Sequence, residues 1–460
     1  MKYEFRSNKI FVAGDNAKDP SDFEEYCSKF ETVEKQVNLL NGDETLLVKL
    51  YLPYKEKIFK IDRDELREIK IFNALTKQGL TVIEGENDGP LLKTILTDTE
   101  KNAPVVFKHD VLGFRTVNDK TCFLGYNPIG DFSDLELHST YKNNSLAPGG
   151  SFGAWRKFIM KSVAKKPLLC LITALGVTAS VVFFLKEEGI FTDTLLFALI
   201  GDSSIGKSTL LEYLAANTAA SKKYVHNFSA TTNAIPALLR QHPGMITVLD
   251  EATYTPSIDW DSLLYTIPDG KEKLKCNAAG ELRENEEFSG SVIIASETSV
   301  LERTVQNPGQ MARIVEFEEK WFGTGDEAGD EAENMRRFVA KNYGWVTPKV
   351  ADLLLSEGFS KKLCRRYNKY YNHILSLFDK GVKGVERRLI QRMAVIMTSA
   401  WVFEKAVRVD IHKDKLLKIL IQKLHEIFGE VKSTDKTEQL IESIEGFIKK
   451  HASRFPAVSA

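Results

Sequence analysis

The sequence predicts an α/β protein with a central parallel sheet, an α+β domain before it and a helical part after it. Two segments predict the sheet. Residues 195–200 form an apolar run that is followed by the glycine-rich segment 201–209 and by helical spacing in 210–214. Residues 245–249 form a second apolar run, which ends in two carboxylates. Buried strands that alternate with loops and helices are typical of a parallel sheet.

Length and composition are those of an ordinary globular protein. The chain has 460 residues, enough for two or three domains, with 62 basic and 63 acidic side chains and a net charge of -1. Global charge therefore does not indicate a nucleic-acid partner, and a polyanion would have to be bound by local basic surface. The widely spaced cysteines form no C-x-x-C pair, which argues against a zinc site or disulfide framework and favours a reducing cytoplasm. They are Cys27, Cys122, Cys170, Cys276 and Cys364.

Residues 168–185 contain no charged side chain and follow a group of lysines and one arginine. This length and flanking charge would allow a membrane anchor. Polar residues within the segment and its short distance from the run 195–200 favour a core helix, with the membrane anchor as the alternative. The N-terminus lacks the apolar stretch of a secretory signal. We therefore expect a cytoplasmic protein with no membrane partner.

We expect three parts along the chain. Residues 1–147 contain short strand-like runs and two helix-like stretches, which predict an α+β N-terminal domain. The segment PGGSFG at 148–153 suits a flexible boundary. Residues 154–320 hold the core with the parallel sheet, and the acidic, glycine-rich residues 323–331 suit an exposed loop. The helices of a C-terminal lid follow over 331–460.

The segment GDSSIGKST at 201–209 fits the pattern G-x-x-x-x-G-K-[ST] between a strand and a helix. In that setting backbone N–H groups surround the phosphates of a nucleotide, Lys207 neutralises the terminal pair and the Ser208 hydroxyl binds Mg2+. The predicted cofactors are therefore ATP and Mg2+, and an ordinary glycine-rich turn is the alternative. The predicted nucleotide-binding residues are Gly201, Asp202, Ser203, Ser204, Ile205, Gly206, Lys207, Ser208 and Thr209.

The apolar run 245–249 leads directly into Asp250 and Glu251. Phosphoryl transfer needs a metal that neutralises charge and a positioned water. We expect Asp250 to hold the Mg2+ shell and Glu251 to orient and deprotonate the attacking water. Together with the phosphate motif this pair predicts ATP hydrolysis, with Lys207 and Glu251 among the catalytic residues. The adjacent base favours additional-strand ATPases over small-molecule kinases.

Further positions are candidates for contacts with the terminal phosphate. The strand-like run SVIIAS ends in small polar residues, so either Ser296 or Thr298 could sense the γ-phosphate. The alternative is a hydroxyl that only makes a local hydrogen bond at the end of the strand. Arg313 precedes another strand, and from this position it could act as a catalytic arginine at the nucleotide of a neighbouring subunit. A local salt bridge is the alternative. Arg388 and Arg392 begin a long apolar helix and could reach back to the nucleotide as a second sensor.

Lysines alternate in the segment DGKEKLKCNAAGELR at 269–283, which predicts a hairpin with its turn at 277–280. Alternation places Lys271, Lys273 and Lys275 on one face, where they could bind the phosphate backbone of DNA. A solvated edge strand with protective lysines is the alternative.

A second basic segment, KKLCRRYNKYY at 361–371, combines lysines and arginines with tyrosines. A basic helix with interleaved aromatic side chains could face nucleic acid. The alternative is a helix with one solvated basic face whose aromatic side chains turn to the core.

Several segments, in this order, resemble the ATPase known as a domain of unknown function in phage, plasmid and island primase-helicases. They are KTCFLGY, GSFGAW, GDSSIGKST, VLDEAT, the lysine-rich hairpin, GQMARIVEF, KNYG and RLIQR. The match covers most of the chain. Within this family the sequence is most similar to the replication initiator helicases of staphylococcal pathogenicity islands and cassette elements, which are similar to minichromosome-maintenance helicases.

The resemblance implies a P-loop AAA+ ATPase core that forms a hexameric ring on DNA. It also implies ATP bound between subunits, Arg313 acting in trans, and a hairpin around Lys273 and Lys275 that lines a central channel and grips one strand. Two features differ from the family. IIASETS stands where relatives more often have a Gly-Glu pair, and few residues follow the last amphipathic helix, where such initiators often carry a winged-helix domain.

These inferences predict a ring-forming ATP-dependent DNA helicase that translocates on and unwinds DNA in the replication of a mobile genetic element. The alternative is an AAA+ initiator or loader that uses ATP as a binding switch without processive unwinding. A membrane-tethered ATPase, anchored by residues 168–185, is the third hypothesis.

Overall fold

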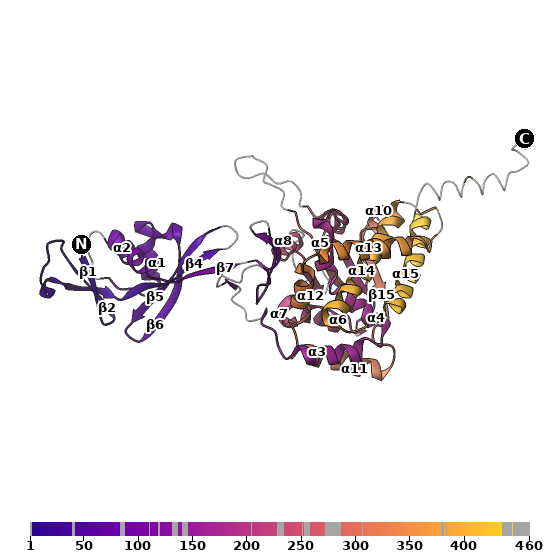
Figure 1. Ribbon diagram of the computed structural model, residues 1–460, viewed down its shortest axis with the longest axis horizontal. Helices are drawn as coiled ribbons and strands as arrows, with labels where there is room; N and C mark the ends of the chain where they lie inside the picture. The colour runs from indigo at the N-terminus through magenta and orange to yellow at the C-terminus, as the bar shows by residue number, and fades with distance from the viewer. Residues whose placement is uncertain are drawn as a thin grey trace, which may run out of the picture. The chain divides into compact units, whose positions relative to one another are not determined.

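The computed structural model shows two compact units (Figure 1). The first comprises Met1–Asp110 and Phe132–Lys142, and the second comprises Val111–Asp131 and Asn143–Ala460. The three-part division of the chain stays a prediction beside this one. The residues that the structure describes are 2–38, 42–82, 88–109, 111–117, 120–130, 137–139, 146–203, 205–227, 234–250, 252, 258–271, 287–305, 307–378, 381–382, 384–434 and 444.

The first unit contains two sheets and two helices. One sheet is antiparallel, with the order β1-β2-β3, and the other has the order β10-β7-β4-β5-β6 with β4 parallel to β7 and antiparallel to β5. The two helices contribute to one buried core with β4, β5 and β6, which contains Leu46, Leu75 and Leu92. The elements are β1 (Lys2–Arg6), β2 (Lys9–Ala13), η1 (Pro20–Asp22), β3 (Glu24–Ser28), β4 (Phe30–Asn38), β5 (Glu44–Leu52), β6 (Lys55–Asp62), η2 (Arg63–Leu66), α1 (Glu68–Lys77), α2 (Asp88–Glu100), β7 (Val105–His109) and β10 (Leu137–Ser139).

The second unit is built on a five-stranded sheet with the order β12-β13-β14-β11-β15, in which every neighbouring pair is parallel. Every residue of β11 and β14 is buried, which explains why these segments are continuous apolar runs rather than alternating ones. The α/β prediction with a parallel sheet is confirmed. The strands are β11 (Leu195–Ile200), β12 (Val225–Asn227), β13 (Ile246–Asp250), β14 (Ser291–Ser296) and β15 (Val315–Glu318).

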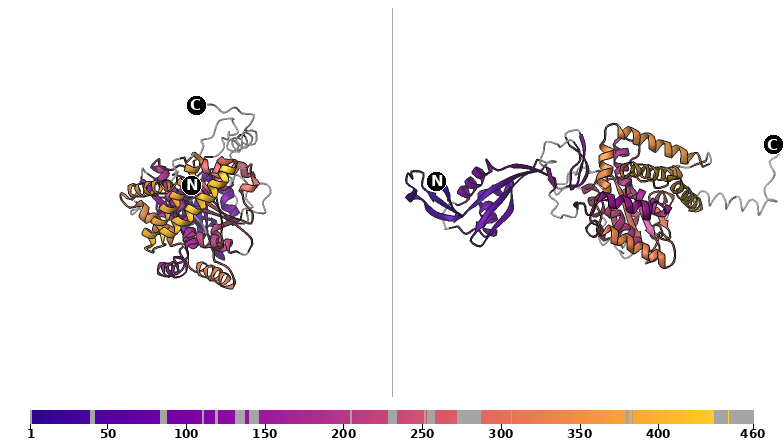
Figure 2. Two further views of the ribbon diagram at one scale, coloured as in Figure 1. Left: turned by 90° about the vertical axis from the view of Figure 1, so that its right-hand side faces the viewer. Right: turned by 60° about the horizontal axis from the view of Figure 1, so that its bottom comes forward.

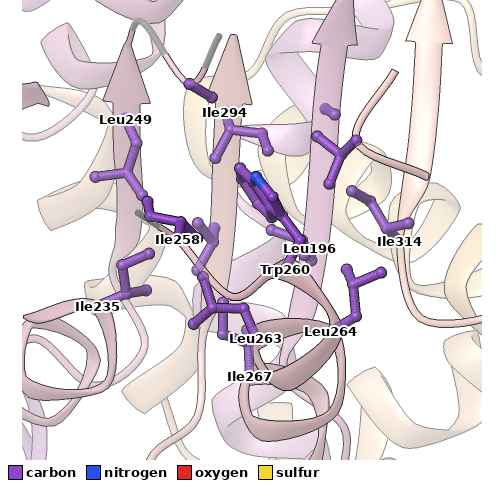
Figure 3. Close-up of a cluster of buried hydrophobic side chains, with 14 of the residues drawn as sticks. Leu196, Ile235, Leu249, Ile258, Trp260, Leu263, Leu264, Ile267, Ile294 and Ile314 are labelled. Atoms are coloured by element: carbon purple, nitrogen blue, oxygen red, sulfur yellow. The ribbon is translucent and has the colours of Figure 1, made fainter. Parts of the chain in front are cut away.

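Helices surround this sheet (Figures 1 and 2). On one face Trp260, Leu263 and Ile267 of α9 point toward Leu196 and Ile294 of the strands, as Figure 3 shows. The described helices are α3 (Phe152–Phe158), a π-helical turn η4 (Ile159–Val163), α4 (Pro167–Leu175), α5 (Thr178–Glu187), α6 (Lys207–Ala216), α7 (Ser221–Tyr224), α8 (Ala234–Gln241), α9 (Trp260–Asp269), η6 (Leu301–Arg303), α10 (Pro308–Met311), α11 (Asp326–Val339), α12 (Val346–Leu355), α13 (Phe359–Leu375), α14 (Gly384–Val407) and α15 (Lys413–Thr434).

A short hairpin completes the second unit. It consists of β8 (Gly113–Val117) and β9 (Lys120–Leu124). The backbone N–H of Phe114 donates to the carbonyl of Pro243 at 2.9 Å, and the Phe114 ring stacks on Phe183 at 5.2 Å between centroids. The hairpin is therefore part of the second unit, although its residues precede position 148.

The apolar segment 168–185 is buried in the core, as predicted, but it forms two helices, α4 and α5, rather than one. The helices are bent by 46° at a break beside Gly176. A Cβ at Gly176 would lie 2.3 Å from Nδ2 of Asn217, so the chain passes very close to the end of α6 there. In the described part of the chain no single helix is long and apolar enough to cross a membrane, and α4 and α5 meet that criterion only as a bent pair.

The acidic segment 323–331 is also corrected, because most of it is helical. Helix α11 begins at Asp326 after Gly325, which has a φ of +84°. Asp326 and Glu327 stand in its first turn, where carboxylates interact favourably with the helix dipole. The expected exposed loop is therefore the start of a helix that packs on α6.

Candidate nucleotide site

The glycine-rich loop connects the buried strand β11 to the first turn of α6. Gly201 and Gly206 have φ values of +133° and +90°, a region that side chains with a Cβ avoid. A Cβ at Gly206 would also lie 2.6 Å from the Phe322 ring. The loop therefore needs glycine for its backbone conformation and its close packing. Helix α6 begins directly after it at Lys207, so unpaired N–H groups of the helix start lie where an anion can bind.

Lys207 is the first residue of α6 and is 9% exposed. Its Nζ donates hydrogen bonds to the carbonyl oxygens of Gly201 at 2.5 Å and Asp202 at 2.7 Å. Burial lowers the pKa of Lys207, while the negative charges of Glu297, Asp250 and Asp202 oppose that shift. A poorly hydrated ammonium group beside a helix N-terminus is well suited to a phosphate.

A cavity of about 500 Å³ lies beside the loop and brings together predicted residues from three elements. The loop and α6 contribute Lys207 and Ser208, β13 contributes Asp250, and β14 contributes Ser296. These side chains converge because parallel strands end at the same edge of the sheet. Ser203, Gly206 and Thr209 also line the cavity.

Helix α11 supplies cavity residues that sequence reasoning missed. Arg336 and Glu333 line the cavity, as does Glu297 at the end of β14. The Nε atom of Arg336 lies 3.5 Å from Oε2 of Glu212 on α6, whose pKa is raised by burial. The signal for this helix was present in the spacing of Glu333, Arg336 and Arg337, since side chains three and four apart share a helix face.

The end of β14 is held by an arginine that the sequence analysis did not select. Arg303 donates from Nη1 to the carbonyl of Ala252 at 3.0 Å and from Nη2 to Oγ1 of Thr298 at 2.5 Å. Its Nη2 also lies 3.5 Å from Oγ of Ser296, which is buried. Arg303 thus ties the end of β14 to the residues after the carboxylate strand, and both predicted sensor hydroxyls contact it.

Several predicted residues lie outside the described part of the chain. They are Ser204, Glu251, Lys273 and Lys275. Lys271 is described and exposed, and it pairs with Glu287 at 2.9 Å and forms an antiparallel bridge with it. The two residues that flank positions 272–286 therefore lie side by side.

Arg313 lies at the other end of the sheet from the glycine-rich loop. Val315, two residues after it, pairs with Phe197 of β11, whereas the loop begins only after Ile200. The Arg313 guanidinium stacks on the Tyr265 ring at 4.3 Å and lies 3.7 Å from Oδ1 of Asp269. The local ion pair is therefore present, and the structure does not bring Arg313 to the phosphate loop of its own chain.

Arg392 is not near the glycine-rich loop either, which corrects the expectation that it could reach back to the nucleotide as a second sensor. Its Nη2 lies 3.1 Å from Oδ2 of Asp193, just before β11, and the residue is 1% exposed. Burial is the largest cause that lowers its pKa to about 10; Asp193 opposes this shift, and the charges of Arg313 and Arg388 add to it. Helix α14 buries Leu389 and Met393 on the same side and carries Arg392 inward with them. Arg388 stays exposed.

One solved structure has a similar fold. A solved structure described as "SCCmec type IV Cch - active helicase" has a TM-score of 0.74 and 22% identity, over 100% of this chain and 84% of that one. This likeness shows the fold. The apo C-terminal region of NrS-1 has a TM-score of 0.27 and 12% identity over 85% of this chain and 90% of that one. No curated protein matches the chain. The family described as "Domain of unknown function (DUF927)" matches residues 9–287, more than half of the chain, and the chain therefore belongs to this family.

Proposed function

We propose that this chain is a ring-forming AAA+ ATPase that uses ATP and Mg2+ to translocate on and unwind DNA in the replication of a mobile genetic element. The observation that carries the proposal is the cavity in which Lys207, Ser208 and Asp250 meet at the ends of β11 and β13. A lysine, a hydroxyl and a carboxylate in this arrangement suit a magnesium-bound triphosphate.

The donor set fits Mg2+ that arrives with a nucleotide. Among the described residues no group of three or more His, Cys, Asp or Glu side chains could hold a metal by itself. Mg2+ commonly takes only one or two protein ligands and completes its shell with water and phosphate oxygens, so Ser208 and Asp250 suffice. When bound, Mg2+ supplies neutralisation of the charge that develops on the transferred phosphoryl group.

The protein's own groups would divide the remaining work. Lys207 and the N–H groups at the start of α6 hold the phosphates, and Glu251, directly after Asp250, orients and deprotonates the attacking water. Ser296 or Thr298 senses the γ-phosphate from the end of β14. Arg336 on α11 lines the same cavity, and its guanidinium can bind the γ-phosphate of ATP. ADP lacks this phosphate and cannot make the same contact.

The strand order supports the AAA+ assignment. β14 lies between the phosphate-loop strand β11 and the carboxylate strand β13, and this inserted strand gives the additional-strand ATPases their name. The helicase likeness at a TM-score of 0.74 supports the same architecture over the full chain.

The position of Arg313 supports assembly into a ring. Arg313 lies at the opposite end of the sheet from Lys207, so it can serve a nucleotide only on a neighbouring copy. Arg388 is exposed and its charge acts on Arg392, which makes it a second candidate for this role. A head-to-tail contact that repeats in this way closes into a ring when its rotation closes. The lysine-rich hairpin with Lys271, Lys273 and Lys275 would then line the central channel and bind the strand.

A forked DNA duplex tests this function. The wild-type protein should displace one strand over many ATP turnovers, and Lys207→Ala should abolish both ATP hydrolysis and displacement while the protein stays folded. Lys223→Ala, at an exposed lysine on α7, is the matched control and should unwind normally. Binding of the fork in ATP without strand displacement would contradict the motor and support a binding switch.

A further inference from the structure

Helix α13 has an uncompensated row of positive charge. Its 17 residues, FSKKLCRRYNKYYNHIL, include lysines and arginines but no aspartate or glutamate. We call the exposed residues Lys361, Lys362, Arg365 and Lys369 the outer ridge. The whole chain has a net charge of -1, so this concentration of one sign is local.

Of the three tyrosines of this helix, Tyr367 is buried, and Tyr370 and Tyr371 are half-buried. Tyr367 is 3% exposed and packs against Phe191 and Tyr371 with ring centroids 6.3 Å apart in both pairs. The Arg366 guanidinium lies over the Trp401 ring of α14 at 5.0 Å. The aromatic part of the segment therefore belongs to the core between α13 and α14, which Figure 1 shows as neighbours. Only cations and polar side chains remain on the outer face.

The outer ridge opposes the stability of its own helix. Lys361 with Arg365 and Arg365 with Lys369 are like charges four residues apart, which destabilise a helix. Lys361 and Lys362 also lie near the helix N-terminus, where the dipole disfavours cations. No ion pair compensates the four charges among the residues that the structure describes, and the carboxylate of Glu188 accepts a hydrogen bond from Ser360 at the helix start instead. Such an arrangement gains stability when an anionic partner neutralises it.

We propose that the outer ridge binds the phosphate backbone of a nucleic acid strand, outside the nucleotide cavity. Lys361 and Lys369 are about 12 Å apart along the helix at 1.5 Å per residue. One strand of a duplex has a phosphate about every 3.4 Å of axis, so a row of this length is long enough to contact more than one phosphate of a strand. Contacts of this kind hold the backbone and carry no sequence preference. The proposal stands independently of whether the ATPase is a motor.

The chemistry of the ridge favours a nucleic acid over an acidic protein. Stable protein interfaces have an apolar or aromatic centre with a polar rim. The outer ridge offers no such centre, because Leu363, Tyr367 and Ile374 point into the core. A uniform polyanion matches a row of cations without needing one.

A salt-dependence experiment tests the ridge. The variant Lys361→Gln/Arg365→Gln/Lys369→Gln removes three charges at four-residue spacing. Its control, Lys157→Gln/Lys161→Gln/Lys165→Gln, removes three exposed charges at the same spacing. The control lysines lie on α3 and its continuation, where Lys166 pairs with Glu331 of the acidic helix α11. Affinity for random-sequence duplex and single-stranded DNA is measured without nucleotide at several salt concentrations.

The ridge variant should bind both DNAs more weakly, and its log K against log salt should be flatter by about 2.7 for duplex or about 2.1 for a single strand. The control should keep the wild-type slope, and both should keep wild-type helical content and basal ATPase activity. An unchanged slope in the ridge variant, or an equal change in the control, would overturn the proposal. The proposal would also be overturned if the ridge variant kept the wild-type slope for DNA but lost binding of polyglutamate, because the ridge would then bind an acidic protein. Failure of Lys207→Ala to stop unwinding would affect only the proposed motor.

Discussion

Arg313 and Lys207 lie at opposite ends of one parallel sheet. Arg313 precedes Val315, which pairs with Phe197 near the start of β11, and Lys207 follows the loop beyond Ile200. A strand rises about 3.3 Å per residue, so the length of β11 alone separates the two ends by about 16 Å. An arginine at one end and a phosphate loop at the other form one site only when two copies meet. This relationship makes assembly part of the proposed chemistry.

Arg336 should contribute to nucleotide affinity. It lies on α11, the first residues of which the sequence predicted to form a loop. Arg336→Ala removes a cation that lines the cavity, and a charge-assisted contact is worth about 1.5 kcal/mol or more, which corresponds to roughly a tenfold rise in Kd. Titration of a fluorescent ATP analogue measures it.

The matched control is Arg337→Ala. Arg337 pairs with Glu333 at 3.0 Å but does not line the cavity. It should bind the analogue like wild type. Equal Kd values for the two variants would remove Arg336 from the site.

Asp193 should stabilise the buried guanidinium of Arg392. Asp193→Asn leaves that cation without its carboxylate, and because Asp193 is 38% exposed we expect a loss of about 2 kcal/mol rather than the larger cost of a fully buried pair. Urea denaturation measures the free energy of unfolding.

The double variant Asp193→Asn/Arg392→Met tests the cause. A methionine fills a similar volume without charge and should recover most of the lost stability, since apolar replacement of a buried ion pair is often neutral. If the double variant is less stable than Asp193→Asn alone, the ion pair is not the reason for the effect.

His242 should make stability depend on pH. Burial is the largest cause that lowers its pKa from 6.5 to about 4, followed by the charges of His226 and Arg115. In the unfolded chain the imidazole takes up a proton near pH 6.5, but in the folded protein it does so only near pH 4. The unfolded state therefore binds more protons between these values, and stability falls as pH falls through this window, by up to about 3 kcal/mol.

His242→Gln should flatten this dependence, because glutamine has no proton to gain. The check is the urea midpoint of both proteins between pH 7 and pH 4.5. A variant with the same pH slope as wild type would show that other groups dominate the window.

Much of the second unit's sheet could be predicted from the sequence. The segments 195–200 and 291–296 are buried on both faces, and such strands are continuous apolar runs that local composition reveals. Strand β12 has only three residues, VHN, and no apolar run, so its place depends on its parallel pairing with β13. The glycine-rich loop was predictable because Gly201 and Gly206 adopt positive φ values, which a local sequence pattern reveals.

The errors concern relationships between distant segments. A helical pattern shows that a face is buried but not what covers it, so the contact of α11 with α6 and the inward path of Arg392 to Asp193 could not be derived from spacing. The break between α4 and α5 lies beside Gly176, which closely approaches Asn217, forty-one positions later in the chain, and helical spacing does not reveal a contact of this kind.

The ATPase activity of a mixture of two inactive variants tests most directly whether a neighbouring copy completes the site. Lys207→Ala and Arg313→Ala should each lose ATPase activity, the second by about a thousandfold or more. In an equimolar mixture about a quarter of the head-to-tail interfaces join an intact Lys207 to an intact Arg313, so ATPase activity should return to about a quarter of the wild-type rate. A mixture no more active than the average of its two components would contradict a site completed by a neighbouring copy.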